Sequence, residues 1–404
     1  MTQNEIRAGI LQLVAGFRIG HTGVRFSYPD SGTRKPLFHQ YPFSMDLFPE
    51  GVFVRNAARR YAAIVGSRVL RVGSLPIDSV LRRMYSVVPA ENEQFLAANL
   101  HYYLRLPELL QGLHIAPSAD SVQLELEKNG QRSTVWVRAE ATRELFTRTV
   151  LSIPDDWVDA GPLRTGNTPL WMRHTDRLRD FDYDKKTATL YVRHSGVWEP
   201  EGETIAAFFT RVFRYADSVK AERFVLDLRL NGGGNNYLNK PVVTGIIRNT
   251  RINRFGHLFV LLGKHTFSAA QNLTNALEKY TEAVFIGEPT SERVNFWGDY
   301  RSEELPESRM EVRISYLWWQ DSDPRDTRRQ TAPLIAAPIT FADYCAGHDP
   351  ALAAVHSFRE KEPVLERFNA LWDAGKAEAA EALLRDFTKD PAHRYALEDV
   401  AGDL

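Results

Sequence analysis

The sequence has little cysteine, little net charge and no long apolar run. Its 404 residues include one cysteine, Cys345, which excludes an internal disulfide framework and leaves no thiolate cluster for a structural metal. The formal net charge of −1 provides no general attraction to nucleic acid or to an anionic membrane. No stretch approaches the roughly 18 apolar residues of a membrane span. We therefore expect no nucleic-acid partner, no membrane span and no structural metal held by thiolates. We also expect no cofactor.

The N-terminus, MTQNEIRAGILQLVAGFRIGHTG, contains only a short apolar run. It lacks the basic leader and the small-residue cleavage site of a signal peptide. As written, the chain is typical of a cytoplasmic protein. A start that had lost a signal segment would make the protein secreted or periplasmic instead.

The pattern of the chain changes three times and predicts four consecutive segments. Residues 1–45 form an N-terminal segment with a helix near 4–16. Residues 46–152 mix strands and helices and end in a hairpin, SVQLELEKNGQRSTVWVRA, around an Asn-Gly turn. Residues 153–349 open with a Pro-, Asp- and Gly-rich loop and then alternate strand and helix. Residues 350–404 are helical and include one repeat-like hairpin.

The third segment predicts an α/β fold. Its short apolar runs ATLYVRH, RFVLDLR, HLFVLLG and AVFIGE are separated by helix-like stretches. This alternation favours a parallel sheet with helices on its faces. The later run MEVRISYLWW predicts a further strand.

A glycine loop follows the second of these strands, in FVLDLRLNGGGNN, with Gly232, Gly233 and Gly234 in a row. Ligands sit at the carboxyl ends of parallel strands, and glycines let the backbone approach a ligand closely. The loop matches neither of the common phosphate-binding patterns. Its N–H groups are suited to hold a tetrahedral oxyanion. A plain tight loop is the alternative.

Ser268 stands at the next strand-to-helix junction, in KHTFSAAQN. Serine is a favoured helix N-cap, which explains many serines at such places. However, successive parallel strands bring Ser268 and the glycine loop to one edge of the sheet. The amide of Ala269 is also available to an oxyanion formed on Ser268. TFSAA is not the nucleophile elbow of typical α/β-hydrolases.

The motifs VLDLRLNGGGNN, TFSAAQN and AVFIGEPT, in this order, resemble the catalytic domain of the tail-specific (C-terminal processing) serine peptidases. The resemblance covers roughly residues 187–345, and residues 46–152 stand where that family has a PDZ-like module. It implies a crotonase-like (ClpP-like) core, peptide hydrolysis and no metal. By its motif Ser268 is the nucleophile, and Gly233, Gly234 and Ala269 line the oxyanion hole.

One branch of that family activates its serine with a lysine placed just beyond the GE.T stretch. Here the stretch is GEPTSERVNFWGD, and Arg293 occupies the matching place. Arginine keeps its proton at any working pH and cannot act as a base. Lys264 and Lys279 are near in sequence but do not match the motif, and we interpret them as solvated lysines.

The other branch resembles tricorn protease and the retinoid-binding proteins of the eye, and takes a histidine from before the PDZ-like module. The segment IGHTGVRF resembles that of this branch and makes His21 the preferred general base. A histidine is suited to accept the Ser268 proton near neutral pH. His265 and His194 are alternative bases.

A histidine base needs an acid on its other nitrogen. In tricorn-like relatives it comes from beyond the nucleophile motif, where YLWWQDSDPRD offers Asp321, Asp323 and Asp326. Asp321 is nearest to the end of the predicted strand and is our choice. Glu288 is a second candidate, and each of these is otherwise a solvated carboxylate.

The stretch NFWGD places Asn295 and Trp297 as candidate substrate-binding residues. Trp297, Trp318 and Trp319 line an apolar specificity pocket or belong to the core. Together these features predict a serine peptidase that forms an acyl-enzyme on Ser268. The alternatives are a weakly active or inactive binding protein on the same fold and a small-ester hydrolase. The sequence leaves the oligomeric state open.

Overall fold

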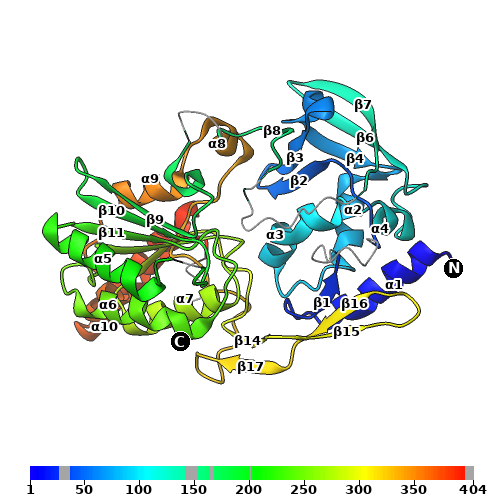
Figure 1. Ribbon diagram of the computed structural model, residues 1–404. Helices are drawn as coiled ribbons and strands as arrows, with labels where there is room; N and C mark the ends of the chain where they lie inside the picture. Colours follow the sequence, from blue (N-terminus) through cyan, green and yellow to red (C-terminus); the bar gives the residue numbers. More distant parts are fainter. Residues whose placement is uncertain (27–36, 142–150, 152, 164–167, 201, 396–404) are drawn as a thin grey trace. The chain divides into compact units, whose positions relative to one another are not determined.

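The computed structural model describes residues 1–26, 37–141, 151, 153–163, 168–200 and 202–395 (Figure 1). Contacts divide the chain into two compact units, neither of which is a single stretch of sequence. Unit 1 comprises residues 1–175, 295–320 and 340–348, and unit 2 comprises residues 176–294, 321–339 and 349–404. The fold combines α-helices with parallel and antiparallel sheets.

Unit 2 contains a six-stranded sheet in the order β18-β13-β12-β11-β10-β9. All neighbours pair in parallel except β9 and β10, which are antiparallel. The elements are β9 Arg179–Asp184, β10 Thr189–His194, β11 Arg223–Asp227, β12 Leu258–Leu262, β13 Val284–Gly287 and β18 Ile335–Ala336, with helices α5 Ile205–Ser218, α6 Lys240–Arg248, α7 Ala269–Tyr280, α9 Pro350–Ser357, α10 Val364–Asp373 and α11 Ala377–Lys389.

The core of unit 2 lies between one face of this sheet and helices α5, α6 and α7, drawn in green in Figure 1. Alternate strand residues such as Leu190, Leu226 and Val260 are fully buried against these helices. On the other face, Phe259 packs edge-on against Phe358, which follows α9. Both faces are therefore covered, which explains why these strands read as continuous apolar runs.

Unit 1 is built on antiparallel strands, with a main sheet whose path is β2-β3-β4-β6-β7. Its elements are α1 Gln3–Ala15, α2 Ile77–Tyr85, α3 Glu93–Tyr103, α4 Pro107–Gly112 and α8 Phe341–Ala346, with strands β1 Gly23–Arg25, β2 Phe43–Phe48, β3 Gly51–Ala58, β4 Arg68–Val72, β5 Leu75–Pro76, β6 Ser121–Lys128, β7 Gln131–Arg138, β8 Trp157–Asp159, β14 Asn295–Gly298, β15 Arg301–Glu304, β16 Glu311–Ile314 and β17 Leu317–Gln320. The predicted hairpin is confirmed as β6 and β7, with positive φ at both Asn129 and Gly130.

Residues 295–320 belong to unit 1, although they follow Ser268 and the parallel strands of unit 2 in sequence. Strand β1 of the N-terminal segment pairs with β16, and β16 pairs with β15. The run MEVRISYLWW, predicted as one strand, forms two strands with different partners, because β17 pairs with β14. Ser315 lies at the break and donates its N–H to the Thr22 hydroxyl.

The predicted segments and the two units divide the chain differently. The pairing of β1 with β16 joins parts of the 1–45 and 153–349 segments within unit 1. Residues 350–395 pack with the parallel sheet in unit 2, where α9 contacts β13. Within the predicted helical hairpin, α10 and α11 pack against each other. The antiparallel edge strand β9 was not expected from the sequence.

Candidate active site

The candidate site lies at the carboxyl edge of the parallel sheet in unit 2. Strands β10, β11, β12 and β13 run in the same direction, so the loops that follow them gather at one edge. The glycine loop follows β11, and Ser268 follows β12 at the start of α7. The predicted nucleophile and the predicted oxyanion loop therefore share this edge.

Ser268 occupies the N-cap position of α7, but its side chain makes no capping hydrogen bond. Its backbone has φ 57° and ψ −125°, a conformation that is rare for a residue with a Cβ. Its N–H donates to Glu292 Oε2 over 3.1 Å, and its carbonyl accepts from the Gln271 amide over 2.7 Å. The structure thus does not support the explanation of Ser268 as a capping serine.

The glycine loop lies directly against Ser268. Gly233 has φ 97°, and a Cβ added to it would lie 2.6 Å from the Ser268 Cβ. Gly234 has φ 141°, and a Cβ there would lie 2.3 Å from the Val197 carbonyl oxygen. Only glycine fits at these two positions, because both the backbone conformation and the available space exclude a side chain.

The amides of the predicted oxyanion hole differ in whether they already donate a hydrogen bond. The Gly233 N–H donates to Asn231 Oδ1 over 3.0 Å. Within the described part of the chain, the N–H groups of Gly234 and Ala269 donate no hydrogen bond. Ala269 is the first residue of α7, where amides lack intrahelical partners and the helix dipole favours negative charge. Gly234 and Ala269 are therefore the donors available to an oxyanion.

Asn231, which the sequence analysis missed, organises this edge. It is fully buried. Its side-chain Nδ2 donates to the His194 backbone carbonyl over 2.8 Å. Its backbone carbonyl accepts from the Phe267 amide over 3.1 Å. Asn231 thereby joins the loops after β10, β11 and β12. Its position directly before the three glycines was the available signal, since asparagine often hydrogen-bonds its own loop.

Asp321 lies at the same end of α7. It accepts a hydrogen bond from Nδ2 of Asn272, one helical turn after Ser268. The other two predicted acids are engaged in ion pairs. Arg325 and its backbone amide lower the pKa of the exposed Asp323 to about 2. Although burial opposes the shift, Arg328 holds the pKa of Asp326 below its usual value.

The alternative bases in unit 2 differ in their surroundings. His194 is fully buried with its ring edge-on to Phe209, and burial lowers its pKa to about 3. Both ring nitrogens of His194 lack hydrogen-bond partners among the described residues. His265 and Lys264 are half-buried. Burial raises the pKa of Glu288, although Lys264 opposes this shift.

The remaining basic candidates from the sequence are Lys279 and Arg293. Lys279 is exposed near the end of α7, with its ammonium 5.3 Å from the centre of the Tyr280 ring. Arg293 is half-buried. Neither observation adds a base to the candidate site.

Unit 1 contains the predicted base His21 and the candidate substrate-binding residues Asn295 and Trp297. The His21 ring stacks on Phe296, with centroids 5.8 Å apart and planes 10° apart. Burial lowers the pKa of His21 to about 4, although the Asp299 carboxylate opposes this shift. The imidazole is therefore neutral at pH 7, the state that can accept a proton.

The candidate substrate-binding residues lie on the two-stranded sheet β14-β17. Asn295 is buried, whereas Trp297 is 42% exposed. Trp297 pairs with Trp318 on the neighbouring strand, and their ring centroids are 5.4 Å apart. The Trp319 indole donates to the Asp299 carboxylate. Trp297 and Trp318 thus form an exposed aromatic pair and are not core residues.

The described residues contain neither a candidate metal cluster nor a membrane-spanning helix. No group of three or more His, Cys, Asp or Glu side chains there is arranged to hold a metal ion. No helix in the described ranges is long and apolar enough to cross a membrane.

The sequence matches no protein-family model and no curated protein. Among solved structures, mature CPAF is similar, with a TM-score of 0.59, 14% identity, and coverage of 88% of this chain and 87% of that chain. Mature CPAF complexed with lactacystin gives a TM-score of 0.56 and 12% identity over 95% and 90% of the chains. The photosystem II D1 C-terminal processing protease has a TM-score of 0.35 and 15% identity, with coverage of 85% of this chain and 86% of that chain.

What this chain shares with the CPAF structures is the fold. Both CPAF matches extend over most of each chain, so this chain has the fold of mature CPAF. The predicted likeness to the tail-specific peptidases is confirmed as a likeness of fold.

Proposed function

We propose that the chain is a serine peptidase that hydrolyses peptide bonds through an acyl-enzyme on Ser268. The observation that carries the proposal is the Ser268 junction. A serine with a rare backbone conformation starts a helix, caps nothing with its side chain, and lies against a glycine loop. The CPAF fold supports the proposal.

In this mechanism the Ser268 hydroxyl attacks the peptide carbonyl carbon and its proton passes to the neutral imidazole of His21. The amides of Gly234 and Ala269 hold the oxyanion. Collapse of the tetrahedral intermediate releases the amine, which takes the proton back from His21. Water then hydrolyses the acyl-enzyme by the same steps. Removing one oxyanion donor typically costs about a hundredfold or more in rate.

Asp321 is our candidate for the acid that orients His21. It is supported by its position beside α7 and by the ion pairs that occupy Asp323 and Asp326. Asn295 and Trp297 remain the proposed substrate contacts. The exposed Trp297 side chain suits an apolar residue of a peptide substrate.

We further propose that the parallel sheet of unit 2 is the crotonase-like catalytic core. The antiparallel sheet within residues 46–152 takes the place of a PDZ-like module. Residues 1–45 supply the base, and residues 350–404 form a helical extension of the catalytic domain at 153–349.

A fluorophosphonate probe tests the proposal, because it phosphonylates an activated serine. We expect labelling of the wild type and none of Ser268→Ala. The exposed Ser302 offers a matched control, and Ser302→Ala should label at the wild-type rate. If the folded wild type takes up no probe, the chain is not a serine hydrolase.

The base and the ligand class can be tested with the same probe. We expect His21→Ala to slow labelling strongly and His265→Ala to leave it within about threefold. Equal rates for wild type and His21→Ala would exclude His21 as the base. Because a CPAF structure holds lactacystin, we also expect lactacystin to compete with the probe for Ser268. Turnover of peptides but not of simple esters would separate a peptidase from an esterase.

A further inference from the structure

The backbone of Ser268 needs support from its surroundings. Its φ of 57° and ψ of −125° lie in a region that residues with a Cβ rarely occupy, and such residues persist only where neighbouring groups hold them. The peptide unit before Ser268 is held at both ends. The Phe267 carbonyl accepts from the Ala270 amide over 3.1 Å, and the Ser268 N–H donates to Glu292.

Glu292 is well suited to hold that N–H. Its side chain is fully buried, and Oε2 accepts the Ser268 N–H over 3.1 Å. A buried carboxylate is costly unless hydrogen bonds compensate for its lost hydration. Keeping a glutamate here is therefore expensive, and the bond to Ser268 offsets part of that cost.

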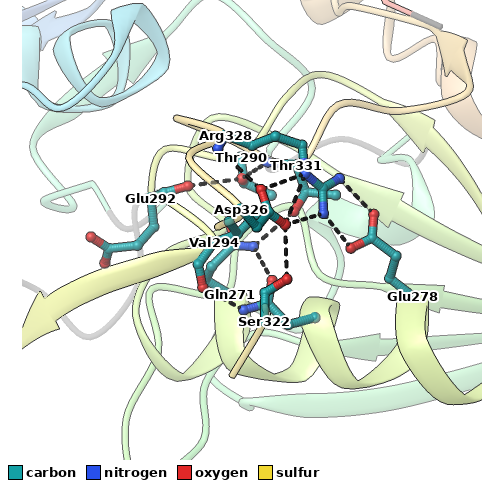
Figure 2. A network of polar contacts seen from close by, with 10 residues as sticks. Gln271, Glu278, Thr290, Glu292, Val294, Ser322, Asp326, Arg328 and Thr331 are labelled. Atoms are coloured by element: carbon teal, nitrogen blue, oxygen red, sulfur yellow. Dashed lines mark hydrogen bonds and ion pairs between the residues drawn. The ribbon is translucent and has the colours of Figure 1, made fainter. Parts of the chain in front are cut away.

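The backbone around Glu292 is itself fixed to α7 (Figure 2). The Thr290 hydroxyl donates to the Glu292 carbonyl over 3.3 Å and accepts from the Thr331 amide over 2.9 Å. The Thr331 hydroxyl accepts from Gln271 Nε2 on α7 over 2.8 Å. The chain of bonds from Glu292 therefore returns to the helix that Ser268 begins. This closed arrangement leaves Glu292 little freedom to move away from Ser268.

We propose that Glu292 is a positioning residue for the nucleophile. It holds the Ser268 amide and so keeps the serine backbone in its strained conformation. It also removes the Ser268 N–H from the oxyanion hole, which leaves that role to Gly234 and Ala269. This inference rests on the proposed function of Ser268 as nucleophile.

Two substitutions of similar size separate acceptance of the hydrogen bond from simple filling of space. Glu292→Gln retains an oxygen that can accept the Ser268 N–H, whereas Glu292→Met fills the site without a strong acceptor. We expect fluorophosphonate labelling of Glu292→Gln within about threefold of wild type, and labelling of Glu292→Met at least about tenfold slower. Glu278→Gln serves as a control, because it removes an ion pair with Arg328 in the same network without contacting Ser268.

Hydrogen exchange at the Ser268 amide provides a second measurement that does not depend on activity. We expect this amide to exchange at least about tenfold faster in Glu292→Met than in wild type, with rescue by Glu292→Gln. Unlabelled wild-type protein would contradict the proposed function, and exchange would then still decide the role of Glu292. Unchanged exchange in Glu292→Met overturns the inference. In protein that labels, Glu292→Met at the wild-type rate, or Glu278→Gln as slow as Glu292→Met, also overturns it.

Discussion

The contact between the glycine loop and Ser268 makes a strong prediction for Gly233→Ala. A Cβ on Gly233 would lie 2.6 Å from the Ser268 Cβ, 2.8 Å from the Phe267 carbonyl oxygen and 2.9 Å from the Ala269 nitrogen. Ordinary contact begins at 3.4 Å. The Ser268 side chain and the first helical amide must therefore move for the alanine to fit.

The cost of this substitution has two parts. Holding alanine at the Gly233 φ of 97° costs about 1–3 kcal/mol. Forcing a methyl group into occupied space costs about 1–3 kcal/mol more. The sum of about 2–6 kcal/mol is a large part of the 5–15 kcal/mol typical of a folded domain. A displacement approaching 1 Å at the proposed nucleophile should also reduce the labelling rate by up to about a hundredfold.

The neighbouring Gly232 provides a matched control. A Cβ there meets nothing within 4 Å, and the φ of Gly232 is not positive. We expect urea unfolding of Gly232→Ala within about 0.5 kcal/mol of wild type, and fluorophosphonate labelling at nearly the wild-type rate. Gly233→Ala should lose both stability and labelling. If the two variants behave alike, the close packing of Gly233 against Ser268 is not what positions the serine.

Three further predictions concern the same edge of unit 2. Ser268→Gly should be more stable to urea than Ser268→Ala by about 1 kcal/mol, because glycine adopts positive φ without strain; equal stability would show that the backbone is relaxed. Asn231→Ala should lower the free energy of unfolding by about 1–3 kcal/mol, because it leaves the Gly233 amide unpaired, and a urea midpoint equal to wild type would contradict its role. Since burial lowers the pKa of His194 to about 3, below its unfolded value near 6.5, the unfolded chain binds the proton first. The contribution of His194 to the free energy of unfolding should therefore be fully present above about pH 6.5. Below that pH, the free energy of unfolding should fall by up to about 1.4 kcal/mol per pH unit. His194→Leu should make that dependence shallower in urea titrations, and an unchanged slope would assign it to other groups.

Most elements of the parallel sheet could be predicted because strands buried on both faces leave an unmistakable apolar pattern. Strands β10, β11, β12 and β13 correspond to the four runs predicted from the sequence. Strand β9, RDFDYD, could not be predicted from an apolar pattern because it is a polar edge strand. The split of MEVRISYLWW into β16 and β17 could not be predicted either, because it depends on two partners that are distant in sequence.

The local part of the candidate site was also accessible from the sequence. Ser268, the glycine loop and Ala269 come together because parallel strands place their loops at one edge. Glu292 and Asn231 were not found, since their role consists of hydrogen bonds to backbone atoms in other loops. Such bonds require atomic positions to be correct within a few tenths of an ångström, and residue patterns do not encode positions at that precision. The pairing of His21 with Ser268 stays a prediction.

By itself, the sequence determined the central strands of the parallel sheet and the place of Ser268 beside the glycine loop, because periodicity and residue chemistry are local properties. The role of Ser268 as nucleophile and the lack of a lysine base stay predictions. Only the tertiary structure decided that β1 of the N-terminal segment pairs with β16 and that Ser268 has a strained backbone. It also decided that the Gly233 amide is already occupied. These features depend on which groups from separate loops come within hydrogen-bonding distance, and that is settled only when the whole sheet and its helices are packed.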